Sequence, residues 1–186
     1  MRPFTHEVVT IWYRAPELLL NIDKYGTSID IWSCGCILAE LFLGEPLFQG
    51  EDEIDQLHKI FKMLGTPDEK IWPGWKDLPN VKRINFHKNY SSENLLREKL
   101  PKISFDDDFI LTDKGFDLLK RLLNYNPEKR ISAEQALLHP WFNENPQMAK
   151  MDEMPSLENL VFKERSKTTK KKLKSLNEEQ IKQREK

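Results

Sequence analysis

Residues 28 to 43 form one long stretch with helical periodicity that is apolar around most of its circumference. Two overlapping helical sets cover it: Ile29, Trp32, Cys36, Ala39 and Phe42, and Ile31, Cys34, Ile37, Leu38 and Leu41. Thr27 or Ser28 is expected to cap its start, and Gly44 to end it. Because a helix that is apolar nearly all round belongs in the middle of a domain, other elements must surround this one.

Other helix signals dominate the body, and strand alternation is scarce. We expect helices over 52 to 64, from a capping box at 66 to 69, over 112 to 124, and from a second capping box at Ser132 and Gln135 to Pro140. Residues 80 to 111 have the proline and charge pattern of an irregular segment on the surface. The sequence therefore predicts a mainly α domain over residues 1–142, with about five main helices.

Composition separates this body from a C-terminal extension, residues 143–186. Ten basic and four acidic residues lie in 163 to 186, although the net charge of the whole chain is −1. No aromatic residue follows Phe162 to stack on bases, so a solvated, disordered or partly helical tail is favoured over a nucleic-acid patch. An import signal at 169 to 174 stays open.

The two cysteines and the hydropathy pattern bear on the environment of the chain. Cys34 and Cys36 are one residue apart in a helical stretch, which points their side chains away from a common face and disfavours a mutual disulfide. No apolar run approaches the length that spans a bilayer, and no signal peptide precedes the body. We expect an intracellular protein, in the nucleus, the cytoplasm or both, with no membrane partner.

Four short motifs follow each other along the body. Trp-Tyr-Arg-Ala-Pro-Glu occupies 12 to 17, Asp-Ile-Trp-Ser-Cys-Gly-Cys occupies 30 to 36, Pro-Leu-Phe occupies 46 to 48, and Arg-Ile-Ser-Ala occupies 130 to 133. In this order and spacing they resemble the C-terminal lobe of a eukaryotic protein kinase, in which Ala-Pro-Glu ends the activation segment. The resemblance implies an incomplete lobe without the N-lobe or the catalytic loop.

Further motifs narrow the resemblance to cyclin-dependent kinases. Thr-His-Glu-Val-Val-Thr at 5 to 10, Glu-Ile-Asp-Gln-Leu at 53 to 57 and Leu-Gly-Thr-Pro at 64 to 67 resemble that family. Residues 69 to 74 and 115 to 119 lean toward its PITSLRE subgroup. The family implies a serine/threonine kinase, with a cyclin partner and protein substrates phosphorylated at Ser/Thr-Pro sites.

The resemblance also implies roles for residues near the start of the chain. Thr5 matches the threonine that an activating kinase phosphorylates, a modification that needs arginines to receive its charge. Val8, Val9 and Arg14 match the pocket for the substrate proline. Thr10 matches the threonine that supports the catalytic loop of the parent kinase.

Two more groups of residues take roles from the family. Glu17 and Arg130 match a buried ion pair that ties the activation segment to the C-terminal helices, and Asp30 matches the anchor of the catalytic-loop backbone. In the family, a small cyclin-kinase subunit binds a docking surface that corresponds to four residues here: Glu53, Ile54, Asp55 and Gln56.

The motifs that carry phosphoryl transfer do not occur in the sequence. There is no glycine-rich loop, no His-Arg-Asp and no Asp-Phe-Gly, and the four histidines lack metal-ligand spacing. We therefore expect that ATP and magnesium belong to the parent kinase and that the chain alone has no catalytic residues, no cofactor and no metal. The alternative is a non-catalytic helical binding module derived from a kinase C-lobe.

Overall fold

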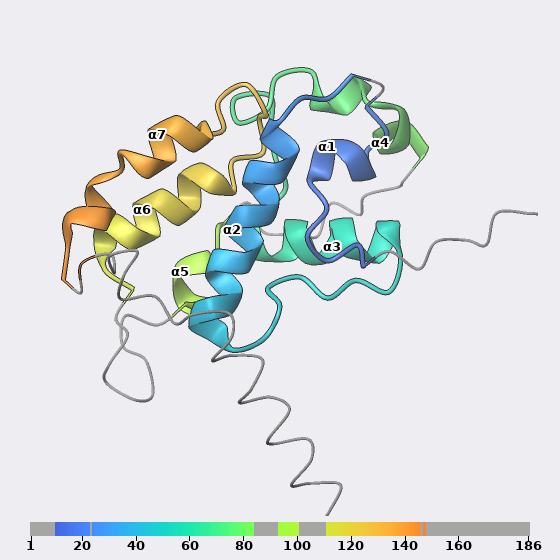
Figure 1. The fold of residues 1–186 in the computed structure, drawn as a ribbon. Helices are drawn as coiled ribbons and strands as arrows, with labels where there is room; N and C mark the ends of the chain where they lie inside the picture. The colour runs from blue at the N-terminus through green and yellow to red at the C-terminus, as the bar shows by residue number, and fades with distance from the viewer. Residues whose placement is uncertain (1–9, 23, 84–92, 101–110, 146, 148–186) are drawn as a thin grey trace, which may run out of the picture. The chain divides into compact units, whose positions relative to one another are not determined.

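The computed structural model describes residues 10–22, 24–83, 93–100, 111–145 and 147, and within them every regular element is a helix (Figure 1). In chain order the elements are α1 (Pro16–Leu19), α2 (Ser28–Leu43), α3 (Glu53–Leu64), η1 (Trp75–Asp77), α4 (Pro79–Arg83), α5 (Leu96–Lys99), α6 (Asp113–Leu122), α7 (Ala133–Leu137) and η2 (Pro140–Asn143). The chain divides into two units, Met1–Glu144 and Asn145–Lys186, and all of these helices belong to the first. The mainly α class predicted from the sequence is confirmed.

The helix predicted over 28 to 43 forms as α2, but its start differs from the expectation. Thr27 is itself in the right-handed helical region (φ −64°, ψ −11°), and its side chain makes no capping hydrogen bond. The predicted end is correct, because Gly44 adopts φ +72° and its N–H donates to the carbonyl of Glu40 at 2.8 Å. A side chain at this position would be strained, so glycine defines the boundary.

Side-chain caps fix the starts of three other helices where the sequence placed them. The carboxylate of Asp52 accepts from the N–H groups of Ile54 and Asp55 at the start of α3. The hydroxyl of Thr112 accepts from the N–H of Gly115 at the start of α6. Ser132 and Gln135 form the predicted capping box at the start of α7, with both reciprocal hydrogen bonds present.

The helix predicted to begin at 66 is wrong. Glu69 does not return to the start of the segment as a capping box requires, because its carboxylate accepts from the N–H of Gly74 at 2.8 Å. Asp68 instead caps a single turn through the N–H groups of Lys70 and Ile71. Pro73 and Gly74, which adopts φ +75°, then end the turn before a second can form.

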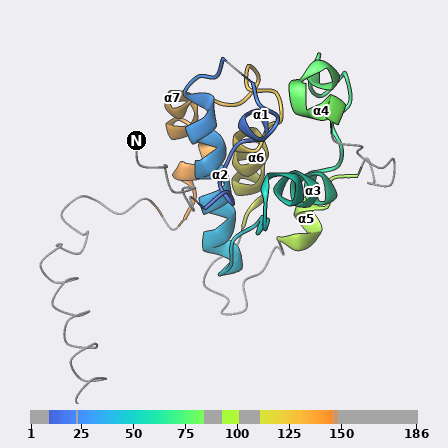
Figure 2. The same cartoon turned by 90° about the vertical axis from the view of Figure 1, so that its right-hand side faces the viewer.

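The central helix packs along α6, as Figures 1 and 2 both show. The two helices approach closely at Gly35, where an added Cβ would lie 2.8 Å from Cδ2 of Leu123 and 3.0 Å from Cβ of Leu122. Glycine at this point lets the backbone of α2 come near the neighbouring segment. Elsewhere in the same unit, α1 packs on α3.

A cluster of aromatic rings occupies the centre of the core. The phenol ring of Tyr125 lies 6.2 Å from the ring of Trp32, 6.0 Å from Phe61 and 6.3 Å from Trp72. Its hydroxyl donates to the carbonyl of Gly65 at 2.7 Å, which satisfies the buried polar atom. This ring therefore joins α2, α3 and the segment after α3.

One face of α2 is left uncovered by the described residues. Asp30 and Cys34 are exposed, the side chain of Ile37 is 50% exposed and that of Leu41 is 77% exposed. Steps of four, three and four residues place these four on one side of a helix, and we call them the α2 stripe. By contrast, Trp32 on the same helix is fully buried.

Candidate functional site

Residues 10 to 15 form a short connection into α1, and its side chains contact α2 and the start of α3. A turn closes it, in which the N–H of Arg14 donates to the carbonyl of Ile11 at 3.0 Å. Trp12 and Arg14 then bind the start of α3, and Tyr13 binds α2. This connection is therefore held in place by long-range contacts rather than by regular secondary structure.

Trp12 is joined to the start of α3 by a closed ring of three hydrogen bonds. Its indole N–H donates to the carbonyl of Gly50 at 2.9 Å, and its own carbonyl accepts from Nε2 of Gln56 at 3.1 Å. Oε1 of Gln56 in turn accepts from the N–H of Gly50 at 2.7 Å. A Cβ at Gly50 would lie 2.5 Å from this Oε1 and 2.6 Å from Cα of Gln56, so glycine is required for the approach.

Tyr13 is fixed to α2 at both its side chain and its backbone. Its hydroxyl donates to Oε2 of Glu40 at 2.7 Å, and its carbonyl accepts from the hydroxyl of Ser33 at 2.8 Å. The hydrogen bond to the Glu40 carboxylate raises the pKa of Tyr13, with desolvation as a smaller cause. Neither Ser33 nor Glu40 was singled out from the sequence, since each partner is at least 20 residues away along the chain.

Arg14 and Glu53, which the sequence placed in two different sites, form an ion pair. Nη1 of Arg14 lies 2.5 Å from Oε1 of Glu53, with side chains 30% and 54% exposed. Such an exposed pair is worth little for stability, of order 0.2–1 kcal/mol. Its consequence is geometric: the predicted substrate pocket and the predicted docking surface share a contact.

Glu17 and Arg130 are brought together in the interior. Nη1 and Nη2 of Arg130 donate to Oε1 and Oε2 of Glu17 at 2.6 and 2.9 Å, and the side chains are 1% exposed for Glu17 and fully buried for Arg130. Arg130 also donates to the carbonyls of Ser28 and Asn124, and its guanidinium lies 5.2 Å from the centre of the Trp32 ring. The cation is thus saturated with acceptors, as a buried charge requires.

The remaining residues whose roles come from the family resemblance are either exposed or outside the described part of the chain. Thr5, Val8 and Val9 lie outside the described residues. Thr10 is the first described residue and is exposed, and Asp30 is exposed in the first turn of α2. Their proposed partners in a catalytic loop are not part of this sequence, so both stay predictions.

The residues of the predicted docking surface differ in their exposure to solvent. Ile54 is half exposed, and Asp55 forms an ion pair with Lys59 at 2.9 Å. The N–H of Glu51 donates to the Asp55 carboxylate and is the largest cause of its lowered pKa. Gln56 is fully buried in the ring with Trp12, so its side chain cannot be reached by a partner, and its assignment to the docking surface is corrected.

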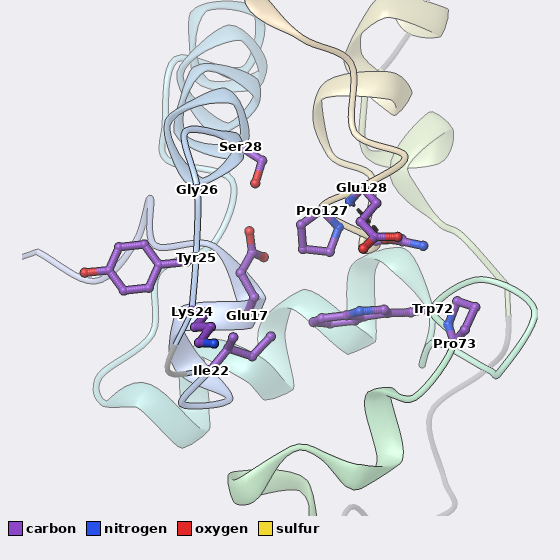
Figure 3. Close-up of a pocket in the computed structure, with 11 residues that line it drawn as sticks. Glu17, Ile22, Lys24, Tyr25, Gly26, Ser28, Trp72, Pro73, Pro127 and Glu128 are labelled. Carbon is purple, nitrogen blue, oxygen red and sulfur yellow. Dashed lines mark hydrogen bonds between the residues drawn. The ribbon is translucent and has the colours of Figure 1, made fainter.

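A pocket of about 420 Å³ lies beside Glu17 (Figure 3). The indole of Trp72 and the ring of Pro127 face the space in front of the Glu17 carboxylate. Lys24 and Glu128, both exposed, also line it. The lining thus combines the Lys24 ammonium with the carboxylates of Glu128 and Glu17, the latter already paired with Arg130.

Side chains of the kinds that bind metals do not cluster in the described part of the chain. Among the described residues, no group of three or more His, Cys, Asp or Glu side chains could hold an ion. Cys34 and Cys36 are both free thiols, as the sequence predicted. In the same part of the chain, no helix is long and apolar enough to cross a membrane.

Comparison with known protein families identifies the class of protein to which this chain belongs. The family of the protein kinase domain matches residues 1–142, which is more than half of the chain. The helical body with its buried Glu17–Arg130 pair is therefore part of a protein kinase domain.

Relatives give the family within that class. Cyclin-dependent kinase G-2 of Oryza sativa is 52% identical over 98% of this chain, and cyclin-dependent kinase G1 of Arabidopsis thaliana is 51% identical over 84% of it. Cyclin-dependent kinase 11B of Homo sapiens is 49% identical over 78%. The chain belongs to the cyclin-dependent kinase family, as its motifs predicted. It spans 26%, 25% and 17% of the length of these three relatives.

Proposed function

We propose that this chain is the C-terminal portion of a cyclin-dependent-type serine/threonine kinase that transfers the γ-phosphate of ATP to Ser/Thr-Pro sites. In this proposal Val8, Val9 and Arg14 form the pocket for the substrate proline, and Thr10 supports the catalytic loop. Thr5 receives the activating phosphate. A cyclin is the partner of the whole kinase, which works in the nucleus, the cytoplasm or both.

The observation that supports this proposal is the anchoring of the connection into α1. Trp12, Tyr13 and Arg14 are held by α2 and by the start of α3, and Glu17 is held by Arg130. A pocket that selects one substrate side chain needs a backbone held to a fraction of an ångström, and these contacts supply it immediately after Thr10. The described residues supply positioning, while none of them supplies phosphate-transfer chemistry.

The proposal also implies that another part of the kinase completes the lobe. The α2 stripe supports this. Ile37 and Leu41 are apolar and exposed on the same helix that buries Trp32 in the core. An uncovered apolar face on a central helix indicates a segment that normally lies against it. We assign that place to the part of the kinase domain that carries the catalytic loop, with Asp30 at the end of the stripe as its anchor.

A peptide phosphorylation assay tests the proposal. The full-length protein, with its cyclin, is given ATP, magnesium and two peptides that differ only in proline or alanine after the acceptor serine. We expect a strong preference for the proline peptide, and no phosphorylation of either peptide by residues 1–186 alone. Equal rates for the two peptides, or activity of the 186-residue chain alone, would contradict the proposal.

The second candidate is a non-catalytic binding module. It is favoured by the surface at the start of α3, where the half-exposed Ile54 lies among exposed acidic residues, namely Glu51, Asp52 and Glu53. A small cyclin-kinase subunit is the partner proposed for Glu53, Ile54 and Asp55. Mass spectrometry of the endogenous protein separates the two: peptides that precede residue 1 support the kinase, and a product that starts at Met1 supports the module.

A further inference from the structure

The partner of Arg14 points to a further residue that affects substrate selection. Arg14 belongs to the proposed proline pocket, and its Nη1 lies 2.5 Å from Oε1 of Glu53. Glu53 is the first residue of α3 and comes from the surface proposed for docking. Through this contact, α3 reaches the side chain of a residue in the proposed pocket.

The position of Glu53 is itself fixed from two sides. On one side, the carboxylate of Asp52 caps α3 through the N–H groups of Ile54 and Asp55 at 2.9 and 2.8 Å. On the other, the ring of hydrogen bonds between Trp12, Gly50 and Gln56 ties the start of α3 to the segment that carries Arg14. The backbone at Glu53 is thus fixed by the helix cap and by this ring of hydrogen bonds, and its carboxylate binds Arg14 from that fixed position.

An arginine side chain loses conformational freedom when its guanidinium is fixed, and a partially exposed one needs a partner to stay in one rotamer. Arg14 is 30% exposed, so the protein interior does not by itself restrict it. The contact with Glu53 occupies Nη1, and in the proposed function the rest of the planar group faces the substrate proline.

We propose that Glu53 is a positioning residue for Arg14 and that, through Arg14, it sets how strongly the kinase prefers proline after the phosphorylated Ser or Thr. This inference rests on the proposed function, because it takes Arg14 as part of the proline pocket. Glu53 does not touch the substrate. Its effect is on the population of the Arg14 rotamer that completes the pocket.

The test uses the full-length kinase with its cyclin and the proline and alanine peptides described above. We compare Glu53→Gln with Glu45→Gln, a matched control in which an equally exposed carboxylate loses its ion pair with Lys99. The ratio of kcat/KM for the two peptides is expected to fall about two- to fivefold in Glu53→Gln, mainly through KM of the proline peptide. In Glu45→Gln the ratio should stay as in the wild type.

Two further measurements separate positioning from a general structural effect. Because an exposed ion pair is screened by salt, the wild-type ratio should fall as the ionic strength rises, while the Glu53→Gln ratio should change less. In a double-mutant cycle, Glu53→Gln should have no further effect on the ratio once Arg14 is replaced by Ala.

The outcomes distinguish this inference from the proposed function. If the wild-type kinase shows no preference for proline, both the proposed proline pocket and this inference are contradicted. A wild-type preference that Glu53→Gln leaves unchanged, or a loss of rate on both peptides alike, would overturn the inference and keep the proposed function. An effect of Glu53→Gln that persists in the Arg14→Ala protein would show that Glu53 does not act through Arg14.

Discussion

Arg130 holds Glu17 through two hydrogen bonds of 2.6 and 2.9 Å, with both side chains almost completely removed from solvent. The two residues are 113 positions apart, so this contact closes the body of the fold from its first helix to the segment before α7. It stabilises the end of the connection that carries Trp12, Tyr13 and Arg14. The connection into α1 and the C-terminal helices of the lobe therefore depend on one another.

Breaking the Glu17–Arg130 pair should be costly. We expect Arg130→Met to lower the free energy of unfolding of the kinase domain by about 3–5 kcal/mol, because Glu17 is left buried without its partner. The double variant Glu17→Leu/Arg130→Met should be more stable than the single variant, since no charge is stranded. Urea unfolding followed by tryptophan fluorescence measures both.

The control for this prediction is Arg121→Met, which removes an exposed pair with Asp117. Its cost should be below about 1 kcal/mol. A similar cost for the buried and the exposed pair would contradict the importance assigned to Glu17 and Arg130.

The close approach at Gly35 predicts a large effect from one methyl group. Gly35→Ala would place Cβ 2.8 Å from Leu123 and should destabilise the fold by about 1–3 kcal/mol, because the packed side chains must shift. Gly26→Ala is the matched control, since an added Cβ there meets nothing within 4 Å. Thermal unfolding of both variants checks this, and equal midpoints would count against the close α2–α6 packing.

The Tyr13–Glu40 hydrogen bond predicts a pH dependence. The pKa of Tyr13 is raised in the folded protein, so the fold favours the neutral phenol. This contribution to stability is present below about pH 10, where the unfolded phenol is also neutral, and is lost as the pH rises through the higher folded pKa. The stability difference between the wild type and Tyr13→Phe should therefore be constant up to about pH 10 and shrink above it.

Urea unfolding midpoints between pH 8 and pH 11 measure that difference. Tyr25→Phe, which removes a phenol that is 61% exposed, serves as the control for loss of one tyrosine. A wild-type advantage over Tyr13→Phe that stays the same to the highest pH would rule out the contact with Glu40 as its cause.

The helices were predictable where their signals are local. The periodicity of residues 28 to 43, 52 to 64 and 112 to 124 and the capping box at Ser132 can be read from a few neighbouring positions, and helices form at each of them. The capping box at 66 to 69 failed because Pro73 and Gly74 stop the helix just beyond it. A local start signal does not fix where a helix ends.

The contacts of the candidate site were much less predictable. The ring between Trp12, Gly50 and Gln56 joins residues 38 and 44 positions apart, and nothing near any of them marks the others as partners. Gln56 was assigned to a docking surface because of its neighbours in a motif, whereas its burial gives it a structural role. The requirement for glycine at position 50 becomes visible once the approach of Gln56 is known.

The reactivity of Cys34 tests the central claim, that another part of the kinase covers the α2 stripe. Cys34 is exposed in this structure, whereas Cys36 is 1% exposed and burial raises the pKa of its thiol. Labelling the native full-length protein with iodoacetamide, with fragment-ion mapping of the two positions, follows each thiol. We predict that Cys34 is protected as strongly as Cys36 and that both react after unfolding. Rapid labelling of Cys34 in the native full-length protein would contradict the account.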